Sequence, residues 1–317
     1  MPMHRPPGNP KEKDYQSRLR KVLFYIQENL SEDLSLEKLS EIAFFSPFHF
    51  QKIFSRYVGE SPKQYIMRLR LERIAHYLTL FPSLTINDAA FQAGFSSSST
   101  FIRAFKKYYG TTPEALRNLS LEEISKIGTS KPKKSKSFEL NSSEFWSMNL
   151  INEDVAELTA EMNIEVKMVR SLNVVFVDAH MGDEDVIPNT FKALTRWVEP
   201  RDLITPETQY IGVFLDMPFF TEYEKCRYRA CITLPDGVSA PKGIGCTMVP
   251  GGKYACYSIK GPLQRVFKSL MAFSHGWLNE SGYQIAGITG FELYTENPAN
   301  KPYENIRRTI SIPVKPA

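Results

Sequence analysis

The sequence predicts a two-part protein, with an all-α N-terminal domain followed by an α+β C-terminal domain. Three observations support this: a duplicated helical pattern, a duplicated strand–strand–helix–strand–strand pattern, and a change in the sign of the net charge between them. A chain of 317 residues is also long enough for about two domains. We expect a disordered tail over 1–14, an all-α domain over 15–120, a linker over 121–160 and an α+β domain over 161–317.

The first duplicated pattern is a helix that ends in glycine. Residues 46–62, SPFHFQKIFSRYVGESP, align with residues 97–113, SSSTFIRAFKKYYGTTP, at a shift of 51. Gly59 and Gly110 are placed to end the helices, because the left-handed conformation at this position favours glycine. Aromatic residues recur on one helical face in both copies, namely at Phe50, Phe54 and Tyr57 and at Phe101, Phe105 and Tyr108.

A shorter amphipathic helix precedes each copy. The first, SLEKLSEIAFF, has Ser35 as its expected N-cap, and the second, TINDAAFQAGF, has Thr85. Ala43 and Ala93 are small residues near the points where the two helices of each pair should cross. Two helices with a tight turn and a small crossing residue predict a helix-turn-helix. The sequence therefore predicts two such units, joined by a linker helix over 63–80.

The outward faces of the two longer helices carry residue types that suit a DNA major groove. Arg and Lys can donate to guanine, Gln can pair with adenine, and an apolar group can contact a thymine methyl. For a single helix a solvated polar face is the simpler interpretation, but two such faces on duplicated units favour DNA readout. The candidate residues are Phe48, Gln51, Lys52 and Arg56 in the first unit and Ser98, Ser99, Arg103, Lys106 and Lys107 in the second.

Residues 15–119 resemble the DNA-binding domain of the AraC/XylS family, through IAFFSPFHFQKIFSRYVGESPKQYIMRLRLERIAHYL and INDAAFQAGFSSSSTFIRAFKKYYGTTP. The resemblance implies that one protomer places two recognition helices in successive major grooves, about 34 Å apart. It implies base contacts by Phe48, Gln51 and Lys52 in the first unit and by Ser98, Ser99 and Arg103 in the second. We expect phosphate contacts from Arg56, Lys106 and Lys107.

The charge distribution follows the same division. Residues 1–140 contain 22 Lys and Arg against 14 Asp and Glu, a net charge of +8. Residues 141–317 contain 17 against 21, a net charge of −4. A basic half joined to a mildly acidic half suggests one polyanion-binding domain and one domain with another role. Between them, GTSKPKKSKSFELNSSEF has the Lys-, Ser- and Pro-rich composition that is typical of a tether.

Several other classes of protein are disfavoured. No apolar run approaches the ~18 residues that span a bilayer, and the polar N-terminus lacks the apolar centre of a signal peptide. We therefore expect a cytoplasmic protein with no membrane partner. The four cysteines form no CxxC pair and the five histidines are scattered, so we expect free buried thiols, no metal and no cofactor.

The second duplicated pattern fills the C-terminal half. VVFVDAHMG ends at Gly182 and YACYSIKG ends at Gly261, 79 residues later, and a helix follows each. IGVFLD at 211–216 then corresponds to GFELYT at 290–295, and VPGGKY predicts a hairpin turn. Neither copy alone can bury both faces of its strands, so we expect the two to pack about a pseudo-twofold axis. A cleft between them would be a natural ligand site.

Glu292 interrupts the apolar pattern of its strand. Glu292 shares a strand face with Tyr294, and its equivalent in the first copy is Val213. A buried glutamate without a partner, surrounded by aromatic rings, suits a cationic or lipophilic aromatic ligand. Core packing is the alternative for each aromatic residue. The candidate ligand-binding residues are Glu292, Tyr294, Tyr257, Trp277, Trp197, Tyr210 and Phe214.

The C-terminal half, from about residue 160 to 315, resembles the gyrase-inhibitor-like (GyrI-like) effector-binding domain of multidrug-sensing regulators. YIGVFLDMP, CRYRACITLP, GGKYACYSIKGP and GFELYTENP carry the resemblance, which implies that Glu292 recognises cationic ligands. Together the two resemblances imply a transcription regulator and not an enzyme. Its partners would be double-stranded DNA, a small-molecule effector and RNA polymerase.

Two alternatives remain for the C-terminal half. One is a hydrolase of small electrophilic compounds, in which Glu292 acts with Tyr257 or Tyr294 as acid and base. The other is a gyrase-binding module.

Overall fold

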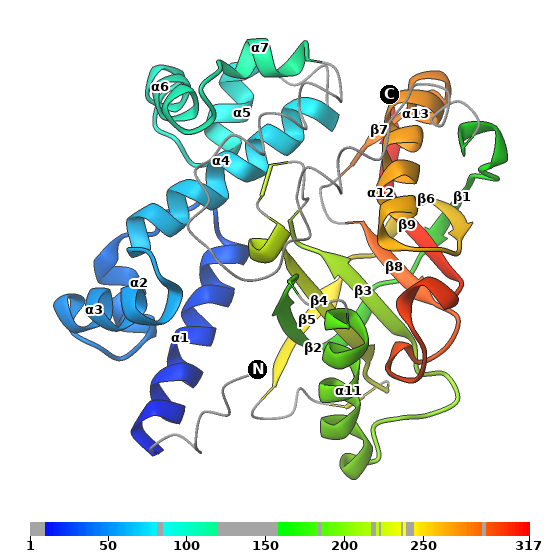
Figure 1. Cartoon of the computed structure of the whole chain (residues 1–317), viewed down its shortest axis with the longest axis horizontal. Helices are drawn as coiled ribbons and strands as arrows, with labels where there is room; N and C mark the ends of the chain where they lie inside the picture. Colours follow the sequence, from blue (N-terminus) through cyan, green and yellow to red (C-terminus); the bar gives the residue numbers. More distant parts are fainter. Residues whose placement is uncertain are drawn as a thin grey trace. The chain divides into compact units, whose positions relative to one another are not determined.

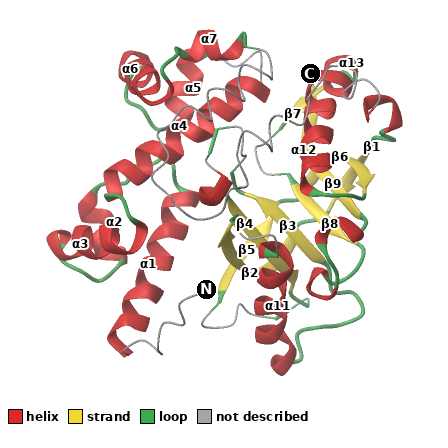
Figure 2. Ribbon diagram, in the orientation of Figure 1, coloured by secondary structure: helices red, strands yellow, loops and turns green. Residues whose placement is uncertain are grey.

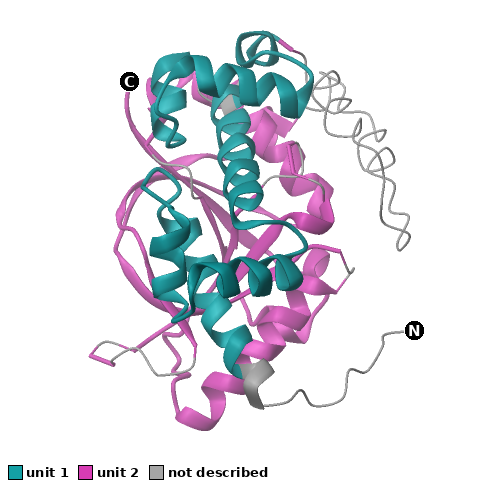
Figure 3. Cartoon of the chain, turned by 90° about the vertical axis from the view of Figure 1, so that its left-hand side faces the viewer, with its two compact units in different colours: residues 1–118 teal, residues 119–317 magenta. Residues whose placement is uncertain are grey.

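The computed structural model divides the chain into two compact units, Met1–Asn118 and Leu119–Ala317 (Figure 3). It describes residues 10–80, 85–119, 158–182, 185–216, 220–221, 223–235, 237–238, 244–286 and 290–317. Residues 121–157 of the expected linker over 121–160 lie outside the described residues. Unit 1 is helical, and unit 2 combines an antiparallel sheet with helices, which confirms the predicted fold class (Figures 1 and 2).

Unit 1 contains two helix-turn-helix pairs. The first pair is α2 with α3, the second is α5 with α6, and α4 joins them. The helices described in this unit are α1 (Pro10–Glu28), α2 (Leu36–Ile42), α3 (Pro47–Val58), α4 (Pro62–Leu80), α5 (Ile86–Gln92), α6 (Ser98–Tyr109) and α7 (Pro113–Arg117).

The predicted helix ends are confirmed. The hydroxyl of Ser35 accepts a hydrogen bond from the amide of Lys38, and that of Thr85 accepts one from the amide of Asp88. Gly59 and Gly110 follow α3 and α6 with φ of 88° and 75°, the left-handed region that L side chains rarely adopt. Local chemistry therefore fixes where these helices begin and end.

Of the aromatic residues predicted on the inner faces of α3 and α6, the phenylalanines are buried, whereas Tyr57 and Tyr108 are not fully buried. Phe50, Phe54, Phe101 and Phe105 are each 0% exposed, as expected. Tyr57 was expected on the same buried face, but it is 45% exposed. Its counterpart Tyr108 is half-buried, and its hydroxyl donates to the carboxylate of Glu72 in α4 at 2.8 Å.

One helix was not predicted. α1 begins at Pro10, so residues 10–14, expected in the tail, are helical. Its apolar residues Leu19, Val22 and Ile26 are at most 1% exposed and pack in the same core as Phe50 and Phe54. Their spacing of three and four residues is the signal that could have identified the helix.

The described part of unit 2 is built on one antiparallel sheet with two principal helices. Its strands are β1 (Glu165–Val169), β2 (Leu172–His180), β3 (Tyr210–Phe214), β4 (Arg227–Thr233), β5 (Gly245–Val249), β6 (Gly252–Ile259), β7 (Tyr283–Ile285), β8 (Phe291–Tyr294) and β9 (Arg308–Pro316). The α-helical and π-helical segments described in this unit are α11 (Val186–Val198), α12 (Leu263–Ala272), a π-helical segment (Phe273–Trp277) and α13 (Leu278–Glu280).

The strand order shows the expected pseudo-twofold relation. The sheet runs β1-β6-β9-β8-β3-β4-β2-β5, and β7 is added beside β9. Exchanging the first copy (β1–β4) with the second (β5, β6, β8 and β9) gives the same order read backwards. The contact between β3 and β8 therefore lies at the centre of the sheet, with Gly212 opposite Glu292.

The predicted hairpin at VPGGKY is wrong. β5 and β6 are consecutive, yet β5 pairs with β2 at one edge of the sheet while β6 pairs with β1 and β9 near the other. The first copy behaves in the same way, because β1 pairs with β6 instead of with β2. Each copy thus contributes its first strand to the other copy, and the turn between them connects diverging strands.

Both helices cover the same face of this sheet. The Phe191 ring of α11 packs against Tyr210, Tyr228 and Tyr294, at centroid distances of 6.4, 6.4 and 5.4 Å. From α12, Phe267 packs against Phe214 at 5.3 Å. Register and alternation place these tyrosines, Phe214 and Glu292 on one face. The helix-covered face therefore holds most of the expected ligand residues.

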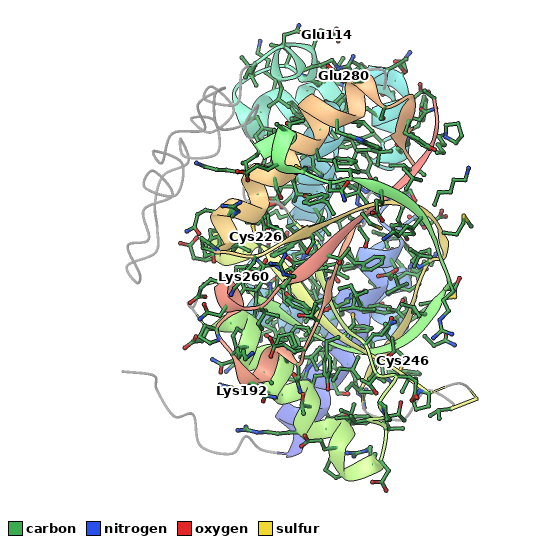
Figure 4. All side chains as sticks on the ribbon, turned by 90° about the vertical axis from the view of Figure 1, so that its right-hand side faces the viewer. Glu114, Lys192, Cys226, Cys246, Lys260 and Glu280 are labelled. Atoms are coloured by element: carbon green, nitrogen blue, oxygen red, sulfur yellow. The ribbon has the colours of Figure 1, made fainter. Side chains whose placement is uncertain are left out.

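The four cysteines are free thiols. Cys226, Cys231 and Cys256 are buried, as expected, whereas Cys246 on the edge strand β5 is only partly covered (Figure 4). Burial raises the pKa of Cys231 to about 12, which makes this thiol unreactive at neutral pH.

None of the described helices combines the length and the apolar character that crossing a membrane requires. Within the described ranges, no three His, Cys, Asp or Glu side chains gather as a metal site would need.

Candidate DNA-binding and effector-binding sites

The outward face of α3 consists of exposed side chains without intramolecular partners. Phe48 is 81% exposed, and Gln51, Lys52 and Arg56 are exposed beside it. Within the described residues, Gln51, Lys52 and Arg56 make no side-chain hydrogen bond or ion pair. Spacings of three and four residues place these side chains on one side of the helix, opposite Phe50 and Phe54. Their hydrogen-bonding groups are therefore available to an external partner.

The start of α6 is organised differently. The hydroxyl of Ser97 accepts from the amide of Thr100 and lies 3.2 Å from the hydroxyl of Ser99. Ser98 donates to the side-chain oxygen of Asn87 in α5. Two of the predicted base-contacting residues therefore already have hydrogen-bond partners in this unit.

The cationic residues of α6 lie farther along the helix. Arg103, Lys106 and Lys107 are all exposed. Arg103 donates to the carbonyl of Ser99 at 3.3 Å, whereas the lysines have no partner among the described residues. The structure thus places all three where a phosphate backbone could reach them.

Buried and half-buried polar side chains of α4 fix both helix pairs to one helix. Arg68 contacts Glu60 at 2.5 Å and Glu72 at 3.1 Å, and Glu72 also accepts the hydroxyl of Tyr108 from α6. These contacts connect the end of the first helix pair to the second. The relative orientation of α3 and α6 is thereby restricted.

Arg70 adds a second connection from α4. Its guanidinium donates to the carbonyls of Leu30, Glu32 and Gly94 at 2.8, 2.8 and 2.9 Å. Gly94 is required there, because its φ is +74° and an added Cβ would lie 2.7 Å from Arg70 Nη2. α4 therefore holds the turn that precedes α6.

In unit 2, Glu292 lies at the centre of a buried polar cluster. It is 2% exposed, as expected, but it does not lack a partner. Its Oε1 accepts the hydroxyl of Tyr303 at 2.6 Å and lies 3.2 Å from Nε of Arg308. Its Oε2 accepts the hydroxyl of Tyr294 at 2.7 Å. The expectation of an unpaired glutamate is therefore wrong.

The pKa values in this cluster are set by burial first. Burial raises the pKa of Glu292 above its ordinary value of 4.5, and Arg308, Tyr303 and Tyr294 oppose that rise. Burial and the charge of Glu292 raise the pKa of Tyr294 and Tyr303 well above 10, as they do that of Tyr228. The tyrosines are therefore neutral hydrogen-bonding groups at physiological pH.

Gly212 makes room for the hydroxyl groups. It stands opposite Glu292 in the central strand pair. An added Cβ would collide with the hydroxyl of Tyr228 and lie 3.0 Å from the Tyr294 ring. The hydroxyls of Tyr228 and Tyr294 are 2.7 Å apart in the space that the glycine leaves.

The other predicted ligand residues differ in how directly they contact the residues around Glu292. Phe214 packs on Tyr228 at 5.1 Å, and Tyr210 lies directly opposite Tyr294 in the pairing of β3 with β8. Tyr257, 2% exposed, shares the face and pairs its hydroxyl with Ser269 at 2.9 Å.

The two tryptophans are less directly connected. Trp277 stacks between Phe273 and Tyr283, so it reaches Tyr257 only through Phe273. Trp197 packs against the guanidinium of Arg201, 4.0 Å from its ring centroid. No described contact joins Trp197 to the Glu292 cluster.

Sequence reasoning missed three members of the cluster. Tyr228 lies in CRYRACITLP, a stretch that carried the family resemblance, so its strand was identified but not its role. Tyr303 and Arg308 follow Glu292 by 11 and 16 residues. Nothing local to the sequence connects an arginine at the start of β9 to a glutamate in β8, because only strand pairing brings them together.

Comparisons with known families agree with this geometry. Residues 39–119 match the helix-turn-helix domain family, and residues 162–315 match the GyrI-like small molecule binding domain family. The chain is 34% identical over 111 residues to the multiple antibiotic resistance protein MarA of Escherichia coli K12, covering 34% of this chain and 85% of MarA.

It is also 32% identical over 161 residues to the HTH-type transcriptional regulator YbfP of Bacillus subtilis 168, covering 50% of this chain and 54% of YbfP. Among solved structures, it is similar to the DNA-binding domain of AdpA in complex with a target DNA. That match has 25% identity and a TM-score of 0.31, and covers 32% of this chain and 89% of that chain. The chain spans about a third to a half of the length of several curated relatives that it matches.

These matches define a helix-turn-helix protein with a C-terminal small-molecule-binding domain. The chain belongs to the AraC family of transcription regulators and carries a GyrI-like domain in its C-terminal half. Both resemblances found in the sequence are confirmed.

Proposed function

We propose that this protein is a one-component transcription regulator that binds a specific DNA sequence through unit 1 and senses a small lipophilic aromatic molecule through unit 2. The DNA contacts come from Phe48, Gln51, Lys52 and Arg56 of α3 and from Ser98, Ser99, Arg103, Lys106 and Lys107 of α6. RNA polymerase is the partner through which such binding would change transcription.

The observation that carries the proposal is the pair of exposed polar helix faces supported by one framework of polar side chains in α4. Exposed Gln, Lys and Arg side chains without partners can donate to bases and phosphates with little rearrangement. The framework of Arg68, Arg70 and Glu72 restricts the spacing of the two helices, which suits two successive grooves of one duplex.

The DNA-binding half is tested by selecting duplexes from a random library with the full chain. We expect one enriched motif with two contacted segments about one helical turn apart. Fluorescence anisotropy at fixed salt should then show at least about a thousandfold preference for that motif over scrambled DNA. Equal binding of all sequences would refute sequence-specific regulation.

The sensing half is tested by titrating aromatic compounds while following tryptophan fluorescence, because all three tryptophans lie in unit 2. Saturable quenching, with a change in DNA affinity when the compound is present, is the expected result, since a ligand regulates only through differential affinity. Recovery of the compound for mass analysis separates sensing from hydrolysis. A chemically altered compound would favour the hydrolase alternative, and an effect that requires gyrase would favour the gyrase-binding one.

A further inference from the structure

We infer that the effector site recognises a neutral aromatic molecule bearing an O–H or N–H donor, in preference to a cation. The inference rests on the proposed sensing function and specifies the ligand class of the same site. Selection of a cation would depend on the negative charge of Glu292. In this chain that charge already has a fixed cationic partner, Arg308.

Arg308 cannot readily release Glu292. Its side chain is 0% exposed, and Nη1 donates to the carbonyls of Tyr303 and Ile306, both at 2.9 Å. Nη2 donates to the carbonyl of Gly261 at 2.7 Å. Moving the guanidinium would leave two buried carbonyls and the partly buried carbonyl of Gly261 without this donor, which is unfavourable. The guanidinium is therefore anchored by backbone on two sides, while its Nε lies 3.2 Å from Oε1 of Glu292 in an ion pair without a geometrically formed hydrogen bond.

The charges of the cluster are balanced before any ligand arrives. Glu292 contributes one negative charge, Arg308 one positive charge, and the surrounding tyrosines are neutral. A bound cation would add an uncompensated positive charge close to a guanidinium that stays in place. Burying an unpaired charge is strongly unfavourable, whereas a neutral ligand leaves the balance unchanged.

The hydroxyl protons of the cluster are already used. Tyr294 and Tyr303 each donate their single proton to Glu292. The hydroxyl of Tyr228, 2.7 Å from that of Tyr294, must therefore be the donor of that pair. The hydrogen bonds run from Tyr228 to Tyr294 to Glu292, and from Tyr303 to Glu292.

The hydroxyl proton of Tyr257 is also used in a hydrogen bond within the protein. Ser269 donates to the carbonyl of Val266 at 2.7 Å, so the hydroxyl of Tyr257 donates to Ser269. All four tyrosines thus retain oxygen lone pairs but no available proton. The ligand group that complements these oxygens is a hydrogen-bond donor, and the rings of Phe191 and Phe214, which pack against Tyr228, favour attaching it to an aromatic frame.

The test uses three probes with one two-ring skeleton and the full-length protein. The probes are 4-phenylphenol, a neutral donor; 4-methoxybiphenyl, neutral without a donor; and N-methyl-4-phenylpyridinium, a cation. We expect 4-phenylphenol to bind about tenfold more tightly than the ether, in line with one added hydrogen bond, and the cation to bind most weakly. The inference is overturned if the cation binds as tightly as 4-phenylphenol. Binding of none of the three would overturn the proposed sensing function itself.

Two variants locate the effect in the cluster. Tyr228→Phe removes the acceptor at the end of the hydrogen-bond chain, so the preference for the phenol over the ether should disappear. Tyr254→Phe is the matched control, because Tyr254 is also buried and hydrogen-bonded, to the carbonyl of Pro250 at 2.8 Å, but on the opposite face of the sheet. A phenol preference that persists in Tyr228→Phe would refute the assigned acceptor.

Arg308→Met tests the charge balance. Removing the guanidinium leaves Glu292 as an unmatched anion, so the cationic probe should gain at least about tenfold relative to the phenol. Unchanged relative affinities in a folded Arg308→Met protein would contradict the role of Arg308. If this variant does not fold, the wild-type probe order and Tyr228→Phe decide the question.

Discussion

The recognition helices and the Glu292 cluster use polar side chains in opposite ways. On α3, Gln51, Lys52 and Arg56 are exposed and have no partner among the described residues. In unit 2, Glu292 and Arg308 are at most 2% exposed and are held by several hydrogen bonds. Exposed side chains without partners suit a partner such as DNA that brings its own hydrogen-bonding pattern. Buried side chains that already have partners instead define the shape and charge that an incoming molecule must match.

The largest expected effect comes from breaking the buried ion pair between Glu292 and Arg308. Arg308→Met should lower the free energy of unfolding of unit 2 by about 3–5 kcal/mol, because it leaves Glu292 buried without a counterion. Lys52→Ala should change stability by less than about 0.5 kcal/mol, since it removes an exposed side chain. Urea unfolding followed by circular dichroism and tryptophan fluorescence measures both. Equal losses of unfolding free energy in the two variants would show that the Glu292–Arg308 pair matters no more to stability than an exposed lysine of α3.

The next largest effect concerns the exposed polar side chains of the two recognition helices. Gln51→Ala together with Arg103→Ala should reduce the preference for the selected DNA motif by about 1–3 kcal/mol for each base pair read, with no loss of stability. The motif would come from the selection described above, and anisotropy titrations of specific and scrambled duplexes provide the measurement. Undiminished specificity in a folded double variant would show that base readout lies elsewhere.

A smaller effect separates phosphate contacts from base contacts. Lys106→Ala should weaken binding to all duplexes alike and reduce the slope of log K against log salt by about 0.9. Lys192→Ala is the control, because Lys192 is an exposed lysine on α11 in unit 2 (Figure 4). Identical salt slopes for wild type and Lys106→Ala would remove this lysine from the DNA interface.

The smallest effect compares the two copies of the helix pair. Tyr108→Phe removes the hydrogen bond to Glu72 and should lower the free energy of unfolding of unit 1 by about 1 kcal/mol. Tyr57→Phe, at the exposed equivalent position, should be neutral within about 0.5 kcal/mol. Far-UV circular dichroism during urea unfolding reports on these helices. Matching losses in the two variants would mean that the hydrogen bond to α4 does not matter.

Local sequence determined most of unit 1. Cap residues Ser35 and Thr85, the left-handed glycines Gly59 and Gly110, and aromatic residues at helical spacing specify helices through contacts only a few residues apart. For the same reason, strands and helices of unit 2 were predicted close to their observed positions. α1 was missed although its apolar spacing was present, and β7 is a three-residue strand that needs β9 beside it.

Only the tertiary structure decided which strands pair and which side chains meet. VPGGKY has the composition of a hairpin turn, but β5 pairs with β2 while β6 pairs with β1 and β9, so the turn joins strands that separate. Glu292 was correctly predicted to be buried, but its partners Tyr303 and Arg308 come from segments placed beside it by the pairing of β8 with β9. Burial follows from the local apolar pattern, whereas the identity of a buried charge's partner depends on long-range pairing, and that partner determines which ligand the site can accept.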